Sequence, residues 1–129
     1  MAENSGEKKP YEIRFEHREG YLYVYGQAMR DSFDTSLGFW MDIATYCKEN
    51  NISRVLVEED FGTDNSMMDT YEIMIQGQKV GFIGVKVAFV DRHPEHMDTN
   101  LFAETVAQNR GLIAKVFTNV KDAEKWLLS

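Results

Sequence analysis

The sequence predicts an α/β fold with a mixed, mainly parallel sheet and the element order ββαβαβαβα. Two short strand-like segments with a glycine-containing turn between them, residues 11–17 and 21–25, predict a β-hairpin at the start. Three apolar, β-branched segments, residues 54–59, 84–90 and 113–117, are each followed by a segment with helical spacing. Strands joined through helices of this length run parallel, so we expect an antiparallel first strand at one edge.

The four helices are predicted from capping residues and from apolar residues three or four positions apart. The expected N-terminal caps are Ser32 or Asp34, then Asp64 or Asn65-Ser66, then Asp98-Thr99-Asn100, and finally Asn119 or Asp122. Gly111 suits the left-handed turn that ends the third helix. The last helix is expected to direct Trp126 inward.

The length of the chain favours one domain. Residues 1–10 are polar and contain Gly6 and Pro10, which predicts a flexible leader. Residues 11–129 are expected to form a single domain, because a chain of 129 residues with 43% hydrophobic residues can build one core.

Charge and cysteine content restrict partners and location. A net charge of −7 without a basic cluster argues against binding to nucleic acid. No segment is long and apolar enough to predict a membrane span. The lone Cys47 and the polar N-terminus, which lacks a secretory signal, predict a cytoplasmic protein.

The end of the sequence, residues 109–127, combines a strand that closes on Val116-Phe117 with a short helix that carries Ala123 and Trp126-Leu127. Together with the element order over residues 11–128, it resembles STAS domains, in an uncharacterised branch of the SpoIIAA-like family of bacterial anti-sigma-factor antagonists. The resemblance implies a STAS-like fold and a non-catalytic regulatory or interaction module with a protein partner. Lipid-transfer domains of the CRAL-TRIO type are grouped with this family, which makes a small apolar ligand the other expectation.

Ser66 is the phosphoacceptor candidate that the resemblance implies. In the best-known antagonists a phosphorylatable serine stands at the start of the second helix, and Ser66 occupies the corresponding position. The small residues that follow this serine in the family are replaced here by Met67-Met68-Asp69. Nearby carboxylates such as Asp64 and Asp69 would repel a phosphate, so the alternative is a serine that only caps its helix.

The loop after the fourth predicted strand is the candidate metal site. Asp91, His93, His96 and Asp98 provide two imidazoles and two carboxylates, a mixture that suits zinc or another first-row divalent ion. With Glu58 and Glu59 at a neighbouring strand end, the loop could serve a metal- or carboxylate-dependent enzyme, which is the alternative function. The other interpretation is a loop that faces solvent, in which Asp98 caps a helix.

Several large apolar residues exceed what one helical stripe needs. The candidate surface for a ligand or a partner consists of Phe33, Phe39, Met67, Met68 and Tyr71. The alternative is that they belong to the core. The edge strand of the hairpin and exposed aromatic residues would also allow a homodimer.

The sequence contains no catalytic or cofactor signature. It has neither a Gly-rich phosphate loop nor a dinucleotide fingerprint, so no cofactor is predicted. Cys47 falls on the apolar stripe of the first helix, which indicates a core residue and not a nucleophile. We therefore do not expect an enzyme.

Overall fold

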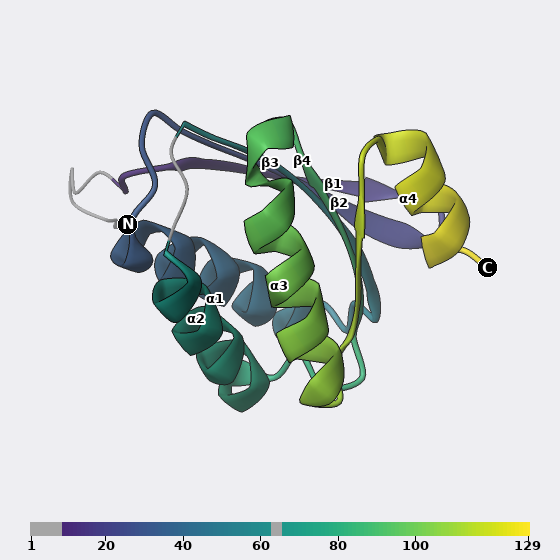
Figure 1. The fold of residues 1–129 in the computed structure, drawn as a ribbon. Coiled ribbons are helices and arrows are strands. Elements are labelled where there is room, and N and C mark those ends of the chain that lie inside the picture. The colour runs from purple at the N-terminus through teal and green to yellow at the C-terminus, as the bar shows by residue number, and fades with distance from the viewer. Residues whose placement is uncertain (1–8, 63–65) are drawn as a thin grey trace.

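A five-stranded sheet with the strand order β1-β2-β3-β4-β5 forms the centre of the fold (Figure 1). The computed structural model describes residues 9–62 and 66–129, apart from the side chains of residue 67 and residues 77–80. The strands are β1 (Glu12–Arg18), β2 (Tyr21–Ala28), β3 (Arg54–Phe61), β4 (Lys86–Asp91) and β5 (Ile113–Phe117). β1 pairs with β2 antiparallel, and the other three pairings are parallel. The predicted mixed, mainly parallel sheet is confirmed.

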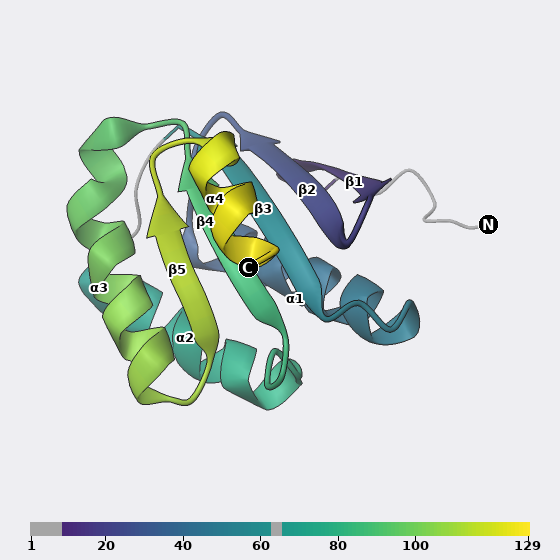
Figure 2. The same cartoon turned by 90° about the vertical axis from the view of Figure 1, so that its right-hand side faces the viewer.

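The helices cover the two faces of the sheet unequally. They are α1 (Phe33–Glu49), α2 (Met67–Val80), α3 (Met97–Asn109) and α4 (Val120–Leu127), with a short 3-10 helix η1 (Pro94–His96) that leads directly into α3. Figures 1 and 2 show α1, α2 and α3 on one face of the sheet and α4 on the other. In the part of the chain that is described, no helix has both the length and the apolarity to cross a membrane.

Three of the predicted helix caps are present. The Ser32 hydroxyl accepts a hydrogen bond from the backbone N–H of Thr35, and the Asn119 side chain accepts one from Asp122. Ser66 Oγ likewise accepts a hydrogen bond of 3.1 Å from the backbone N–H of Asp69 at the start of α2.

The predicted cap of the third helix is wrong. Asp98-Thr99-Asn100 lies inside α3, which begins at Met97. Pro94 stands at the start of η1, where its fixed φ is favourable, and η1 continues into α3 without a separate capping residue. Asn100 is therefore available for another contact.

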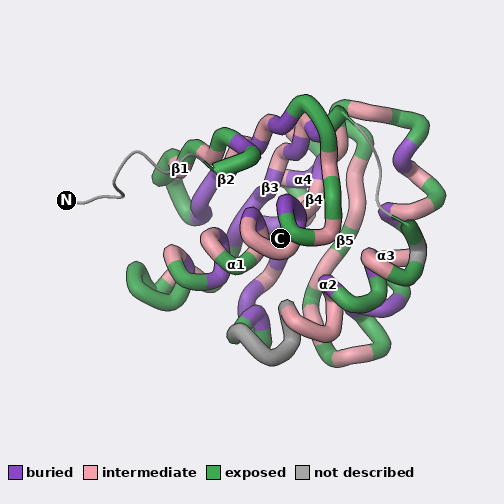
Figure 3. Tube along the Cα trace, turned by 90° about the vertical axis from the view of Figure 1, so that its left-hand side faces the viewer, coloured by how far each residue is buried: buried purple, intermediate pink, exposed green. Residues whose placement is uncertain are grey.

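The core lies on both faces of the sheet, because side chains alternate along each strand. From β3, Val55 and Val57 pack under α1, whereas Leu56 packs under α4. Figure 3 shows buried segments in both β2 and β3.

Phe39 belongs to this core, so its placement in the predicted surface patch is wrong. Its exposed fraction is 0%, and its ring occupies the space above Gly26, where a Cβ atom would lie 2.3 Å from the ring. A glycine in β2 therefore lets the aromatic ring of α1 approach the sheet backbone closely.

The predicted leader, residues 1–10, lies outside the described residues except for Lys9 and Pro10. The Lys9 ammonium donates a hydrogen bond of 2.7 Å to Asp42 in α1.

Candidate functional site

A cavity of about 120 Å³ lies between the sheet and the three helices α1, α2 and α3. Its body is largely apolar and is formed by Trp40, Ile73, Met74, Phe82, Val87, Phe89, Ala103, Ala107, Leu112, Ala114 and Val116, together with the charged residues Glu104 and Lys115. Its other end, at the carboxyl edge of the parallel strands, is polar and is formed by Asp31, Ser36, Glu59, Thr70, Asp91, His96, Thr99 and Asn100. Ligands of α/β folds bind at this edge of the sheet.

Strand register brings two carboxylates together in the polar end. Glu59 of β3 is the direct neighbour of Asp91 in β4, and both side chains point toward the three helices. Glu59 is 7% exposed, and the Asp91 side chain is 5% exposed.

The expectation that Glu58 and Glu59 act together is wrong, because consecutive residues of a strand point to opposite faces. Glu58 lies on the α4 face of the sheet. There it accepts hydrogen bonds from the Tyr23 hydroxyl at 2.5 Å and from the Arg92 guanidinium at 2.9 Å.

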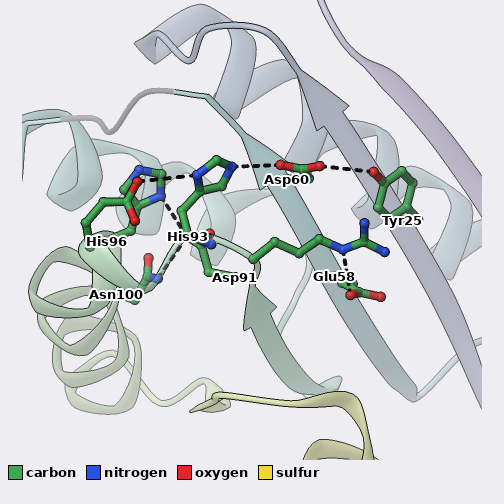
Figure 4. Close-up of polar contacts among 9 residues, drawn as sticks. Tyr25, Glu58, Asp60, Asp91, His93, His96 and Asn100 are labelled. Atoms are coloured by element: carbon green, nitrogen blue, oxygen red, sulfur yellow. Dashed lines mark hydrogen bonds and ion pairs between the residues drawn. The ribbon is translucent and has the colours of Figure 1, made fainter.

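Asp91 is the centre of a buried network (Figure 4). Its Oδ2 atom accepts hydrogen bonds from His96 Nδ1 and from the Asn100 amide, both at 3.0 Å. Its Oδ1 atom accepts the backbone N–H of His93 at 2.9 Å. These contacts hold the His96 ring, which is 5% exposed, at the wall of the cavity.

His93 lies beside His96 but has different partners (Figure 4). The two rings stack with centroids 5.0 Å apart and planes at 20°. His93 Nε2 is 2.7 Å from Asp60 Oδ1, and Nδ1 is 3.4 Å from Glu95 Oε2. Burial lowers the pKa of His93, but the hydrogen bonds to the two carboxylates outweigh that effect and raise the pKa above its ordinary value.

The predicted metal ligands come together only in part. His93, Glu95 and His96 place possible ligand atoms within 4.8 Å of one another. Tetrahedral zinc would hold such atoms about 3.3 Å apart, so this group would have to contract. Asp91 already accepts three hydrogen bonds, and Asp98 is exposed in the first turn of α3, outside the group. The inclusion of Asp98 is therefore wrong.

The predicted apolar surface is small. Met68 is 77% exposed and Tyr71 38% exposed, whereas Phe33 is half-buried and the side chain of Met67 lies outside the described residues. The hydroxyl of Tyr71 accepts a hydrogen bond of 2.6 Å from Arg110, whose guanidinium lies 5.5 Å from the ring centre. Tyr71 therefore links α2 to the end of α3.

Two residues that could carry chemistry do not lie on the cavity wall. Ser66 is exposed and caps α2. Cys47 is buried in the core, and burial raises the pKa of its thiol to about 11, which disfavours the reactive thiolate.

Sequence reasoning missed the cavity and five of its polar residues. Thr99 and Asn100 are predicted only as part of a helix cap, and Asp31, Ser36 and Thr70 are not predicted site residues. The Ser36 hydroxyl donates a hydrogen bond of 2.6 Å to Asp31. A signal was present in α3, where the small residues Ala103 and Ala107 stand four positions apart on one side of the helix. Small side chains at that spacing leave room between a helix and a sheet.

No protein-family model and no curated protein sequence matches this chain, so the geometry of the cavity carries the functional assignment.

Proposed function

We propose that this protein is a non-catalytic binding module that holds a small, largely apolar molecule in the cavity under α1, α2 and α3. The observation that carries this proposal is a cavity of about 120 Å³ with an apolar body and a polar end. Small-molecule sites are typically apolar with a few convergent polar groups, and a dry cavity of about 150 Å³ can accept benzene. The ligand is therefore of the size of one aromatic ring.

A regulatory role of the STAS-like kind is compatible with this proposal. Thr70, in the first turn of α2, lines the cavity one turn after Ser66. A bound molecule would thus touch the helix whose start carries Ser66, the phosphoacceptor candidate that the family resemblance implies. We propose that occupancy of the cavity is communicated through this helix to a protein partner, in a protein that acts in the cytoplasm.

Contact with a partner through the apolar surface has less support. Met68 is exposed, but Tyr71 is held by Arg110 and Phe39 is in the core. A homodimer through the edge strand β1 stays a prediction, which light scattering tests. β1 points Glu12, Arg14 and Glu16 outward, and charges of this kind on an edge strand oppose pairing with a second copy.

A carboxylate-dependent enzyme is the second candidate, and the hydrogen bond between Asp91 and His96 favours it. A carboxylate that orients an imidazole is the usual arrangement of a general base. The hydroxyls along the described cavity wall belong to Ser36, Thr70 and Thr99, and that of Ser36 is bonded to Asp31. Hydrolysis of phenyl acetate that falls about a hundredfold in His96→Leu would favour the enzyme over the binding module.

Ala107→Leu tests the cavity directly. Ala107 is buried and lines the apolar body, so a leucine side chain would occupy the space that we assign to the ligand. We expect toluene to shift the methyl NMR signals of Ala103 and Ala114 in the unmodified protein and to leave them unchanged in Ala107→Leu. Because it fills a cavity, the variant should also gain about 0.5–2 kcal/mol of stability in urea unfolding.

Thr105→Leu is the matched control, since it adds leucine to an exposed position of the same helix. It should bind toluene as the unmodified protein does. Toluene binding that is equally strong in Ala107→Leu would contradict the proposed site.

A further inference from the structure

The polar end of the cavity contains a buried imidazole nitrogen that no described residue engages. His96 is 5% exposed and lines the cavity. Its Nδ1 atom is bonded to Asp91, whereas Nε2 has no hydrogen-bond partner among the described residues. Buried polar atoms are normally paired, so an unpaired atom at a cavity wall indicates a place for a ligand or water.

The hydrogen bond to Asp91 fixes what this nitrogen can do. A carboxylate only accepts hydrogen bonds, so the proton of the neutral imidazole resides on Nδ1. Asp91 Oδ2 also accepts a hydrogen bond from the Asn100 amide, so this oxygen acts as an acceptor toward both of its partners. In the neutral imidazole, His96 Nε2 is therefore a hydrogen-bond acceptor, and the group that meets it has to be a donor.

The carboxylates around the polar end also disfavour a negatively charged ligand. Glu59 and Asp91 are neighbours in the polar end, and Asp31 lines it as well. Among the described residues of the cavity wall, Lys115 is the one lysine or arginine, and its ammonium lies 5.9 Å from the ring centre of Phe117, which packs on the α4 face. A carboxylate ligand would meet other carboxylates there, and no lysine or arginine side chain among the described residues of the wall faces it, which disfavours its charged form.

We propose that the cavity selects an aromatic-sized ligand whose polar head donates a hydrogen bond, such as a hydroxyl or an amino group, and rejects a ligand with a carboxylate head. This inference rests on the proposed binding function and specifies the chemistry of its ligand. The head lies against His96 Nε2 at the carboxyl edge of the sheet, and the apolar body extends toward Ala107.

Two pairs of probes separate the head from the body. Phenol and toluene have equal size and differ in a hydroxyl against a methyl group, and benzamide and benzoate differ in an amino group against a charged oxygen. Dissociation constants come from titrations followed by the methyl signals of Ala107 and Ala114. One additional hydrogen bond predicts phenol about three- to tenfold tighter than toluene. Benzoate should bind at least about tenfold more weakly than benzamide.

Asp91→Asn tests the role of the hydrogen bond between Asp91 and His96. An asparagine amide can donate to Nδ1 and so move the imidazole proton to Nε2, which turns the acceptor into a donor. Anisole, whose oxygen only accepts hydrogen bonds, should therefore bind Asp91→Asn more tightly than it binds the unmodified protein, while toluene binds both equally. His96→Leu removes the imidazole altogether, so the preference for phenol over toluene should disappear while toluene binding is kept. His17→Gln, at an exposed residue of β1, should leave the preference intact.

The outcomes separate the two proposals. Equal binding of phenol and toluene, or of benzamide and benzoate, would overturn the assignment of the head and leave the cavity function standing. If none of the four probes binds, the binding function itself is wrong and the head assignment falls with it. A preference for phenol that survives His96→Leu would show that another group recognises the donor.

Discussion

At the scale of single residues, His93 and His96 lie three positions apart in one loop and have different roles. His96 faces the cavity and is bonded to Asp91, whereas the neighbouring ring of His93 contacts Asp60 of β3. Asp60 also accepts a hydrogen bond of 3.4 Å from Tyr25. His93 thus connects the cavity wall to Asp60 and Tyr25 on the α4 face of the sheet.

The pH dependence of stability should reveal the contact of His93 with Asp60. The pKa of His93 is raised in the folded protein, so the contact contributes fully below the unfolded value of about 6.5 and is lost as pH rises through the folded-state pKa. We expect unmodified protein to melt at a higher temperature than His93→Gln near pH ~5.5, with the difference vanishing at alkaline pH.

Asp60→Asn is the control for this prediction, because it removes the partner of His93. Combining it with His93→Gln should cause no further change in the pH profile. A melting difference that increases toward alkaline pH would contradict the contact.

At the scale of elements, the start of α2 depends on Ser66. Its Oγ atom accepts the backbone N–H of Asp69 at 3.1 Å, and its carbonyl accepts the N–H of Thr70 at 2.9 Å. A side-chain cap of this kind satisfies a helical N–H group that otherwise has no partner. Because Thr70 lines the cavity, the cap also positions part of the candidate site.

Replacements of Ser66 distinguish a cap from a phosphoacceptor. Ser66→Ala should lose about 0.5–2 kcal/mol in urea unfolding, whereas Ser66→Asp should stay close to the unmodified protein because aspartate also caps helices well. Ser53→Ala, at an exposed position before β3, is the control. Mass spectrometry of protein from its own host tests separately whether Ser66 is phosphorylated. An unmodified Ser66 in every growth state would exclude the role of phosphoacceptor.

At the scale of the whole molecule, one sheet supports two cores with one tryptophan in each. Trp40 packs with the core under α1 and lines the cavity, and Trp126 packs with the core under α4. α4 is held to β4 by Lys86, whose ammonium donates a hydrogen bond of 2.9 Å to the Trp126 carbonyl and lies 4.6 Å from the ring centre.

The two tryptophans should report the same unfolding transition. Because β3 and β4 contribute side chains to both cores, loss of one core exposes the sheet beneath the other, and small domains of this kind unfold cooperatively. In Trp40→Phe and Trp126→Phe, the fluorescence of the remaining tryptophan should follow the far-UV circular dichroism of the same variant in urea. Fluorescence of Trp126 that changes before the circular dichroism would show that α4 detaches independently.

The local sequence was enough to predict the hairpin, the mainly parallel sheet and three of the helix caps. The caps depend only on neighbours in the chain, because Ser32, Ser66 and Asn119 bond to N–H groups three residues away. The parallel pairing was predicted from the length of the helical connections. The chemistry of the loop that begins at Asp91 was likewise visible as a local concentration of carboxylates and imidazoles.

The site itself was decided by tertiary structure. Register between β3 and β4 pairs Glu59 with Asp91, and the alternation of side chains sends Glu58 to the other face of the sheet. The course of η1 into α3 turns Asn100 toward Asp91 and leaves Asp98 exposed. The sequence determined which groups this protein possesses and which segments are strands and helices. Only the strand register and the packing of three helices on the sheet determined which groups meet, because contacts across strands and layers depend on residues far apart in the chain.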